Sequence, residues 1–173
     1  MKKVIYAACL LSGIFLASCT KPEDDQLNKI DLTFIMQANI SNSAEIGAGA
    51  LAATKATNPE VKKFAMMMVE QHSMAQSDLR NLGSNVGVEV KDSLDPIHVS
   101  LKDLLTSLPA GRAFDSVYIN SQVPDHDLSI ANFLMEKASG SHRDVIDYAD
   151  RYFPHITMHR QSADSIASAF FRR

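Results

Sequence analysis

Cysteine is scarce in this chain of 173 residues: only Cys9 and Cys19 occur, and both lie close to the N-terminus. The residues after Cys19 therefore contain no thiol for a disulfide, a redox pair or a thiolate metal site. Without such cross-links, the stability of the fold has to come from its hydrophobic core. The roughly 150 residues that follow Cys19 are enough for one domain with one core.

Clusters of positive charge are also lacking. The chain has 17 Lys and Arg residues against 20 Asp and Glu, and the terminal pair Arg172-Arg173 is the one basic group that stands out. Because binding to phosphates needs clustered Lys and Arg, we expect no nucleic-acid partner. The sequence also lacks a nucleophile motif, a phosphate-binding glycine loop and a cofactor fingerprint, so it gives no support for a hydrolase, a kinase or a dehydrogenase.

The N-terminal residues 1–18 contain an apolar run and are typical of a lipoprotein signal peptide. Lys2 and Lys3 form a basic head, and residues 4–15 form an apolar stretch too short for a stable membrane-spanning helix. Leu16-Ala17-Ser18-Cys19 resembles a lipobox, in which cleavage precedes the cysteine and the thiol carries a diacylglycerol. We expect Cys19 to be the lipid-attachment site. The alternatives are an ordinary secretory peptide or a short anchor helix.

Residues 19–26 are polar and without periodicity, so they are expected to form a flexible tether between the lipid and a domain of residues 27–173. Thr20 follows the cysteine, where Asp would be the retention signal of the enterobacterial sorting rule. We therefore expect an outer-membrane lipoprotein of the cell envelope, on either the periplasmic face or the cell surface, with the membrane as its partner through the lipid.

Beyond the tether the sequence has the pattern of helices, with no sustained alternation of period two. Asn58-Pro59 and Asp95-Pro96 each combine an N-cap side chain with a proline that the first helical turn tolerates. Gly140 favours a helix end, and Ser141 with Asp144 resembles a capping box. The fold class is therefore all-α, with four long helices and a short one between the second and third. The predicted helices span residues 27–57, 58–85, 95–107, 111–139 and 141–170.

Each long helix has a stripe of core-facing residues, and one titratable side chain interrupts each stripe. These side chains are Glu45, His72, His126 and His159. Glu45 and His72 lie 13 and 14 residues from the turn at Asn58, which places them at nearly the same level of an antiparallel pair. His126 and His159 differ by about 7 Å along the axis on the same reasoning. One carboxylate and three imidazoles that converge in this way would suit zinc, iron or copper.

Prolines inside the helices bear on that offset. Pro124 and Pro154 each remove one backbone hydrogen bond and favour a kink, which can open or close the gap between His126 and His159. His155 has the better height for the site but lies on a neighbouring face of its helix.

Six segments together carry a family resemblance. They are Ser43-Ala44-Glu45-Ile46-Gly47, residues 56–65, Val69-Glu70-Gln71-His72, residues 113–118, Asp125-His126 and residues 153–159. In this order they resemble the bacterial envelope family described as "predicted outer membrane protein", a domain of unknown function of the DUF4142 type, over about residues 32–167. The resemblance implies a ferritin-like four-helix bundle with a long crossover that contains the short helix. It implies no activity, since none is assigned to the family.

Two hypotheses for the four polar core residues follow. In the first, they hold a single zinc, iron or copper ion in a protein that handles metal or protects against stress. A ferritin-type dimetal centre is not expected, because Val69 and Ile156 stand where the Glu-x-x-His motifs would have Glu. In the second, the chain is a structural or interaction lipoprotein, and the buried Glu and His residues only fix the packing of the bundle through hydrogen bonds.

Overall fold

A computed structural model of the chain describes residues 26–172, and it contains five helices and no strand within that range. The predicted all-α fold is confirmed, and every helix begins and ends within two residues of its predicted bounds. The predicted signal peptide, Cys19 and nearly all of the tether lie outside the described residues. The helices are α1 (Lys29–Lys55), α2 (Pro59–Val86), α3 (Pro96–Ser107), α4 (Arg112–Ser139) and α5 (Arg143–Phe170).

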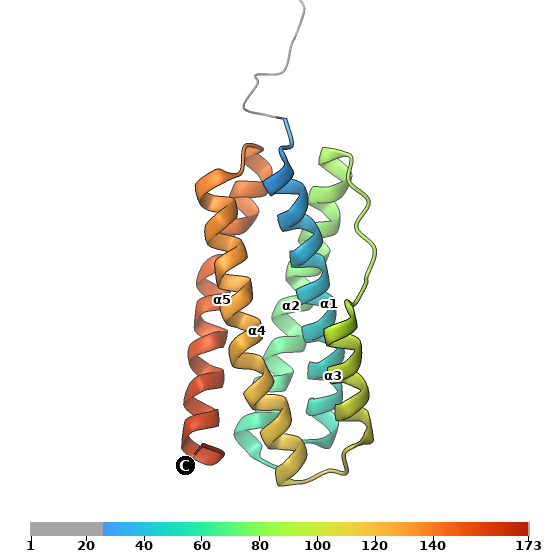
Figure 1. Cartoon of the computed structure of the whole chain (residues 1–173), viewed down its shortest axis with the longest axis vertical. Coiled ribbons are helices and arrows are strands. Elements are labelled where there is room, and N and C mark those ends of the chain that lie inside the picture. The colour runs from blue at the N-terminus through green and yellow to red at the C-terminus, as the bar shows by residue number, and fades with distance from the viewer. Residues whose placement is uncertain (1–25, 173) are drawn as a thin grey trace, which may run out of the picture.

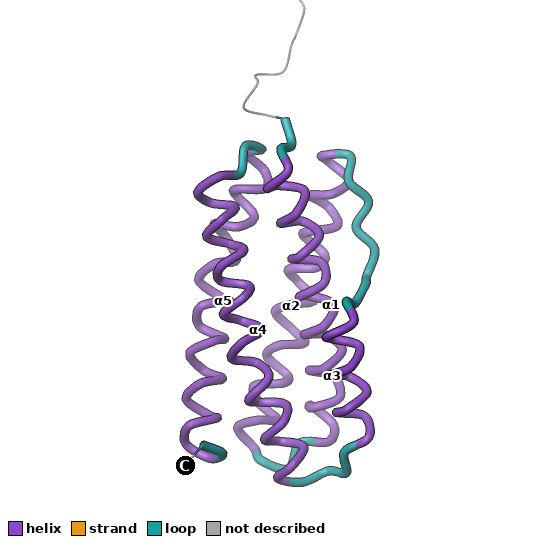
Figure 2. Tube along the Cα trace, viewed as in Figure 1, coloured by secondary structure: helices purple, strands orange, loops and turns teal. Residues whose placement is uncertain are grey.

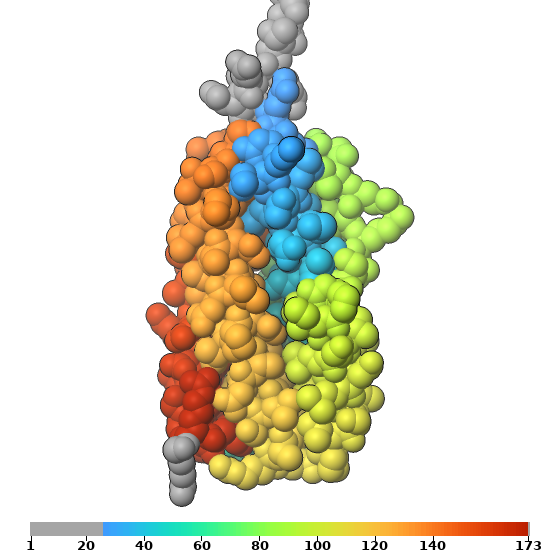
Figure 3. Space-filling model, viewed as in Figure 1, coloured from blue at the N-terminus to red at the C-terminus, as the bar shows by residue number. Residues whose placement is uncertain are grey.

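The four long helices form a bundle of two antiparallel hairpins, α1–α2 and α4–α5 (Figure 1). A long connection returns the chain from the end of α2 to the opposite end of the bundle, and it contains α3 (Figure 2). Helix α3 packs against α1 and α4, and Figure 3 shows it covering the lower half of that side. This is the expected bundle with a short extra helix in its crossover. No helix in residues 26–172 has the length and apolar character needed to cross a membrane.

The helix ends follow the predicted signals with one exception. Asn58 and Asp95 cap α2 and α3 with their side chains, and Gly87 ends α2 in the left-handed conformation with φ of 78°. The predicted capping box of Ser141 with Asp144 is wrong. His142 is the N-cap of α5, and its side chain accepts from the N–H of Asp144.

The reason for this exception is a buried carboxylate on another helix. Asp31 in the first turn of α1 is fully buried, and its Oδ1 accepts from the backbone N–H groups of Ser141 and His142. Ser141 is thereby used to join the α4–α5 turn to the start of α1. The Ser141 side chain bonds to Asp31 and to the carbonyl of Gln26, so His142 caps α5 in its place.

The core consists of two apolar clusters with a polar layer between them. One cluster surrounds Phe64, Phe114 and Tyr118, and the other surrounds Phe34 and Tyr148. Every long helix contributes to both clusters and passes from one to the other at its buried polar residues. The apolar stripes predicted from the sequence therefore do face the core, and the polar layer is shielded along the bundle axis by apolar side chains on both sides.

Candidate metal centre

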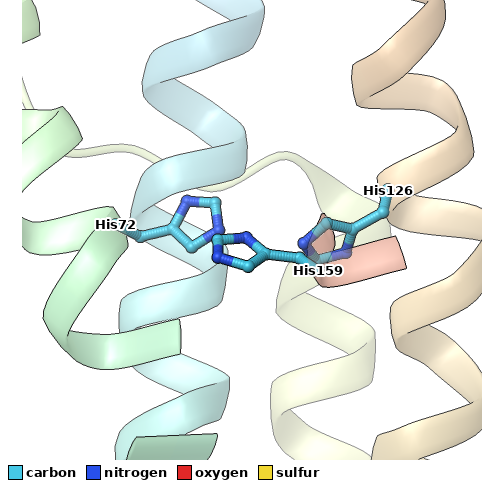
Figure 4. A group of neighbouring side chains, drawn as sticks. All are labelled: His72, His126 and His159. Atoms are coloured by element: carbon cyan, nitrogen blue, oxygen red, sulfur yellow. The ribbon is translucent and has the colours of Figure 1, made fainter. Parts of the chain in front are cut away.

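Three of the four predicted site residues lie together in this polar layer. His72 on α2, His126 on α4 and His159 on α5 point toward one another (Figure 4), and one ring nitrogen from each lies within 4.8 Å of the others. The ring centroids are 5.2 to 5.9 Å apart, and no more than 2% of any of the three residues is exposed. Nitrogens bound to one tetrahedral ion are roughly 3.3 Å apart, so modest ring rotations would bring these three into place.

Two of the histidines have one ring nitrogen fixed by an oxygen acceptor. The Nδ1 of His126 donates to the backbone carbonyl of Gln122 at 2.8 Å, and a carbonyl can only accept. The Nε2 of His159 donates to the side-chain oxygen of Gln71, also at 2.8 Å. In a neutral imidazole with one nitrogen protonated, the other carries a lone pair. The free lone pairs are therefore on Nε2 of His126 and Nδ1 of His159.

The tautomer of His72 is set by a chain of hydrogen bonds that begins at a charged acid. The carboxylate of Asp92 accepts from the amide nitrogen of Gln76, whose amide oxygen then accepts from the amide nitrogen of Asn42. The oxygen of Asn42 is left to accept from Nδ1 of His72 at 2.9 Å. Because Asp92 is ionised and paired with Arg80, the direction of each bond in the chain is fixed. The lone pair of His72 is therefore on Nε2.

The three nitrogens that carry these lone pairs have no hydrogen-bond partner among the described residues. They are Nε2 of His72, Nε2 of His126 and Nδ1 of His159. Leaving a buried polar atom unsatisfied costs on the order of 1–3 kcal/mol. A water molecule can donate only two hydrogens, so it cannot satisfy three converging acceptors at once. A cation can bind all three, and the hydrogen bonds behind the rings are those that hold metal-binding imidazoles in place.

Burial keeps the three imidazoles neutral. It lowers the pKa of His72 well below its usual range, with a further contribution from the two neighbouring histidines. It also lowers the pKa of His126 to about 4 and that of His159 to about 3. At neutral pH all three rings are neutral imidazoles with one N–H each, which is the form that binds metals.

Glu45, the fourth predicted ligand, lies beside this group of three. Its Oε1 is 3.8 Å from Nδ1 of His126, the nitrogen that faces the Gln122 carbonyl and carries the proton. Burial, with a smaller contribution from Asp125, raises the pKa of Glu45 to about 8, so it is a neutral acid at pH 7. The structure therefore brings three predicted ligands together, and direct ligation by Glu45 stays a prediction.

The 7 Å offset expected between His126 and His159 does not keep them apart, and their ring centroids are 5.4 Å from each other. Measured from the true ends of the helices at Ser139 and Arg143, the two residues lie 13 and 16 positions away, which is a difference of about 4.5 Å. The tilt of the side chains along their helices covers the rest. Helices α4 and α5 continue through Pro124 and Pro154.

Sequence reasoning missed the side-chain amides that orient two of the histidines. Asn42, which accepts from His72, is 4% exposed, and Gln76, which positions Asn42, is 1% exposed. Gln71 accepts from His159. A signal for Gln76 was present, since it follows His72 by four residues, a spacing that places both side chains on the same face of α2.

The fold and this centre define the class of protein: an all-α bundle of four long helices with three converging histidines in its core. Within that class, the chain belongs to the family described as Domain of unknown function (DUF4142), whose model matches residues 17–166. The resemblance drawn from the sequence motifs is thus confirmed. No curated protein is detectably similar in sequence.

A solved structure supports the fold. The crystal structure of a DUF305 fragment from Deinococcus radiodurans is similar with a TM-score of 0.72, covering 83% of this chain and 99% of that chain. The two sequences are 10% identical. At that identity the similarity shows a shared bundle architecture and nothing about activity.

Proposed function

We propose that this protein is a lipid-anchored protein of the bacterial cell envelope that binds one transition-metal ion, zinc, iron or copper, through His72, His126 and His159. The observation that carries the proposal is a set of three buried histidines with ring nitrogens within 4.8 Å of one another, each of which has one nitrogen without a hydrogen-bond partner among the described residues. Imidazole nitrogen suits all three metals. A role in metal handling or in protection against stress follows from a site of this kind in the envelope.

The three histidines His72, His126 and His159 are called the triad below. The neutral acid Glu45 next to the triad supports the proposal, because a divalent ion would bring two positive charges into an apolar core. Glu45 is close enough to His126 for the ion to favour loss of its proton, which would leave a balancing negative charge. A single ion also fits better than two. Val69 and Ile156 occupy the places where bridging glutamates would be needed for a dimetal centre.

The envelope location rests on the sequence alone. The basic head, the short apolar stretch and Leu16-Ala17-Ser18-Cys19 together support a lipoprotein signal, with the lipid on Cys19. In the envelope, a protein with a single-ion site would meet metals that enter or leave the cell.

The metal content of the protein purified without a polyhistidine tag tests the proposal. We expect close to one zinc, iron or copper ion per chain in the wild type. His72→Ala should lower the affinity by more than the 10–100-fold typical of changes behind a ligand, since it removes a ligand itself. His98→Ala removes a histidine on α3 outside the triad and serves as the matched control. Glu45→Gln should weaken binding less than His72→Ala does if Glu45 only balances charge.

The same variants separate this proposal from the structural alternative. If the triad binds metal, added metal should raise the melting temperature of the wild type and of His98→Ala but not of His72→Ala, because binding to the folded state stabilises it. If the histidines only fix the packing, His72→Ala should destabilise the chain by ~1–3 kcal/mol with no dependence on metal. Sub-stoichiometric zinc, iron, copper and manganese, with no thermal shift on adding any of them, would overturn the proposal.

A further inference from the structure

A hollow of about 170 Å³ opens from the protein surface onto the triad between α2 and α5. Its inner wall includes His72 and His159, and its outer wall includes Met74 and His155, which are both exposed. Two other hollows, under α3 and between α1 and α4, have volumes of about 10 Å³ each, and no triad histidine lines either of them. The α2–α5 hollow therefore connects solvent with two of the three proposed ligands.

The seam between α2 and α5 is loosely filled along much of its length. Hollows of about 490 Å³ and 290 Å³ lie on the same seam, toward either end of the bundle. Around the hollow above the triad, polar side chains join the two helices. Asp78 on α2 accepts from Arg151 and from the hydroxyl of Tyr152 on α5. Such bonds between half-exposed groups exchange readily with water, in contrast to the apolar packing on either side of the polar layer.

One amide connects an exposed histidine with a buried one inside this hollow. The side-chain oxygen of Gln71 accepts from Nε2 of His159 at 2.8 Å and from Nδ1 of His155 at 3.2 Å. With its Nδ1 donating, His155 keeps a lone pair on Nε2. The Gln71 side chain thus links the exposed imidazole of His155 to the buried imidazole of His159.

We propose that the α2–α5 hollow is the entrance through which a metal cation reaches the triad, and that His155 and Met74 bind the incoming ion first. This inference rests on the proposed function. Imidazole and thioether together suit borderline and soft cations such as zinc and copper. An ion held at the outer wall can exchange its water molecules stepwise for His72 and His159, as the Gln71 side chain moves aside.

An anion is a poorer fit for the same hollow. Arg151, the cation in its wall, is already paired with Asp78 at 3.1 Å, so its charge is balanced. The rest of the wall contains no Lys or Arg, and its polar groups are an amide, a phenol and imidazoles. The hollow therefore favours a cation that is coordinated by nitrogen and sulfur atoms.

Stopped-flow binding of Co²⁺ tests the inference, because its visible absorption reports when the ion is bound by the imidazoles. We compare the metal-free wild type with His155→Ala and Met74→Leu. If the hollow is the entrance, association and dissociation should both slow by about tenfold in His155→Ala while the equilibrium affinity changes by less than about threefold, since the triad is intact. Met74→Leu should show the same pattern to a smaller degree. Met66→Leu, an equally exposed methionine on α2 outside the hollow, is the matched control.

The outcomes distinguish this inference from the proposed function. If the wild type binds no Co²⁺, the proposed function fails. If the wild type binds Co²⁺ and both hollow variants show unchanged rates, the entrance lies elsewhere and the inference is overturned. A large loss of affinity in His155→Ala would also overturn it, because His155 would then be a permanent ligand. His155 is exposed, so its replacement is not expected to disturb folding.

Discussion

A buried histidine has two ring nitrogens, and buried polar atoms in proteins nearly always have a hydrogen-bond partner. In this bundle the acceptors Asn42, Gln122 and Gln71 each take one N–H, so the second nitrogen of each triad ring is a bare acceptor. The arrangement has the hydrogen-bonding pattern of imidazoles held ready for a metal. Had the Asn42 and Gln71 side chains offered their amide nitrogens instead, the protons of His72 and His159 would lie on the inner nitrogens and would repel a cation.

The low pKa values of the triad predict how binding depends on pH. Protons compete with a metal only below the pKa of the folded ligand, which is about 4 for His126 and about 3 for His159. Metal should therefore stay bound from pH 7 down to about pH 5, whereas an exposed imidazole protonates near pH 6.5. The measurement is the metal content after dialysis at a series of pH values. A loss centred between pH 6 and 6.5 would show that the ligands are not the buried rings.

The sequence revealed the three histidines but not their orientation. Each histidine interrupts an apolar stripe, and that interruption can be seen in the sequence. The chain of bonds from Asp92 to His72 depends on the connection between α2 and α3 lying against the bundle, which no local pattern determines. The height of Glu45 along the bundle, in contrast, can be predicted from the sequence, because it follows from the number of residues between Glu45 and the α1–α2 turn.

At the scale of elements, helix bounds were predictable because caps and prolines are local signals. Hydrogen bonds between distant elements could not be predicted from the sequence. Asp115 is an example. It lies off the apolar stripe of α4, yet it is 1% exposed and accepts from the backbone N–H groups of Thr57 and Asn58 in the α1–α2 turn. A buried carboxylate that binds a distant turn looks like a surface acid in the sequence.

The close approach of α1 and α2 can be tested with two glycines of α1. A methyl group on Gly49 would lie 3.1 Å from the carbonyl oxygen of Ala65 and 3.1 Å from Val69 Cγ2, whereas one on Gly47 would meet nothing within 4 Å. Gly47→Ala should stabilise the fold by about 0.5–1 kcal/mol through helix propensity. Gly49→Ala should be about 1–2 kcal/mol less stable than Gly47→Ala, because the contact offsets that gain. Urea unfolding compares the two, and equal stabilities would refute the tight packing.

A second prediction concerns two buried acids, Asp31 on α1 and Glu136 on α4. Hydrogen bonds, first from the backbone of Asn28, lower the pKa of Asp31 although its burial opposes this. Burial and the neighbouring Asp31 raise the pKa of Glu136 to about 8 from an ordinary value of 4.5. The folded state therefore holds a proton that the unfolded chain releases, so stability is lost as the pH rises from about 4.5 to 8.

Glu136→Gln removes this titration while keeping the size of the side chain. Relative to the variant, the wild type should lose stability steadily between pH 5 and pH 8. Urea unfolding of both proteins at pH 5, 6.5 and 8 measures the difference. Were that difference constant across the three pH values, Glu136 would not carry the buried proton.

For the whole molecule, the proposed anchor and the proposed metal centre are far apart along the chain. The described part of the chain begins at the end of the bundle where Asp31 binds the α4–α5 turn. Asn42, which orients His72, lies 11 residues beyond Asp31 along α1, a rise of about 17 Å. The apolar cluster around Phe64, Phe114 and Tyr118 lies further still from that end of the bundle. Attachment to a membrane and binding of a metal should therefore be independent.

This independence gives the last prediction. In Cys19→Ser, no other thiol near the expected cleavage point can take a lipid, so the chain should remain unprocessed and should incorporate no fatty-acid label. Metal content per folded chain should nevertheless equal that of the wild type, because the triad and its amides are untouched. Fatty-acid labelling, the mass of the chain and elemental analysis of the same preparation measure all three quantities. Label that persists in Cys19→Ser would refute the lipobox, whereas metal that disappears together with the lipid would show that the core forms only after the chain has been processed.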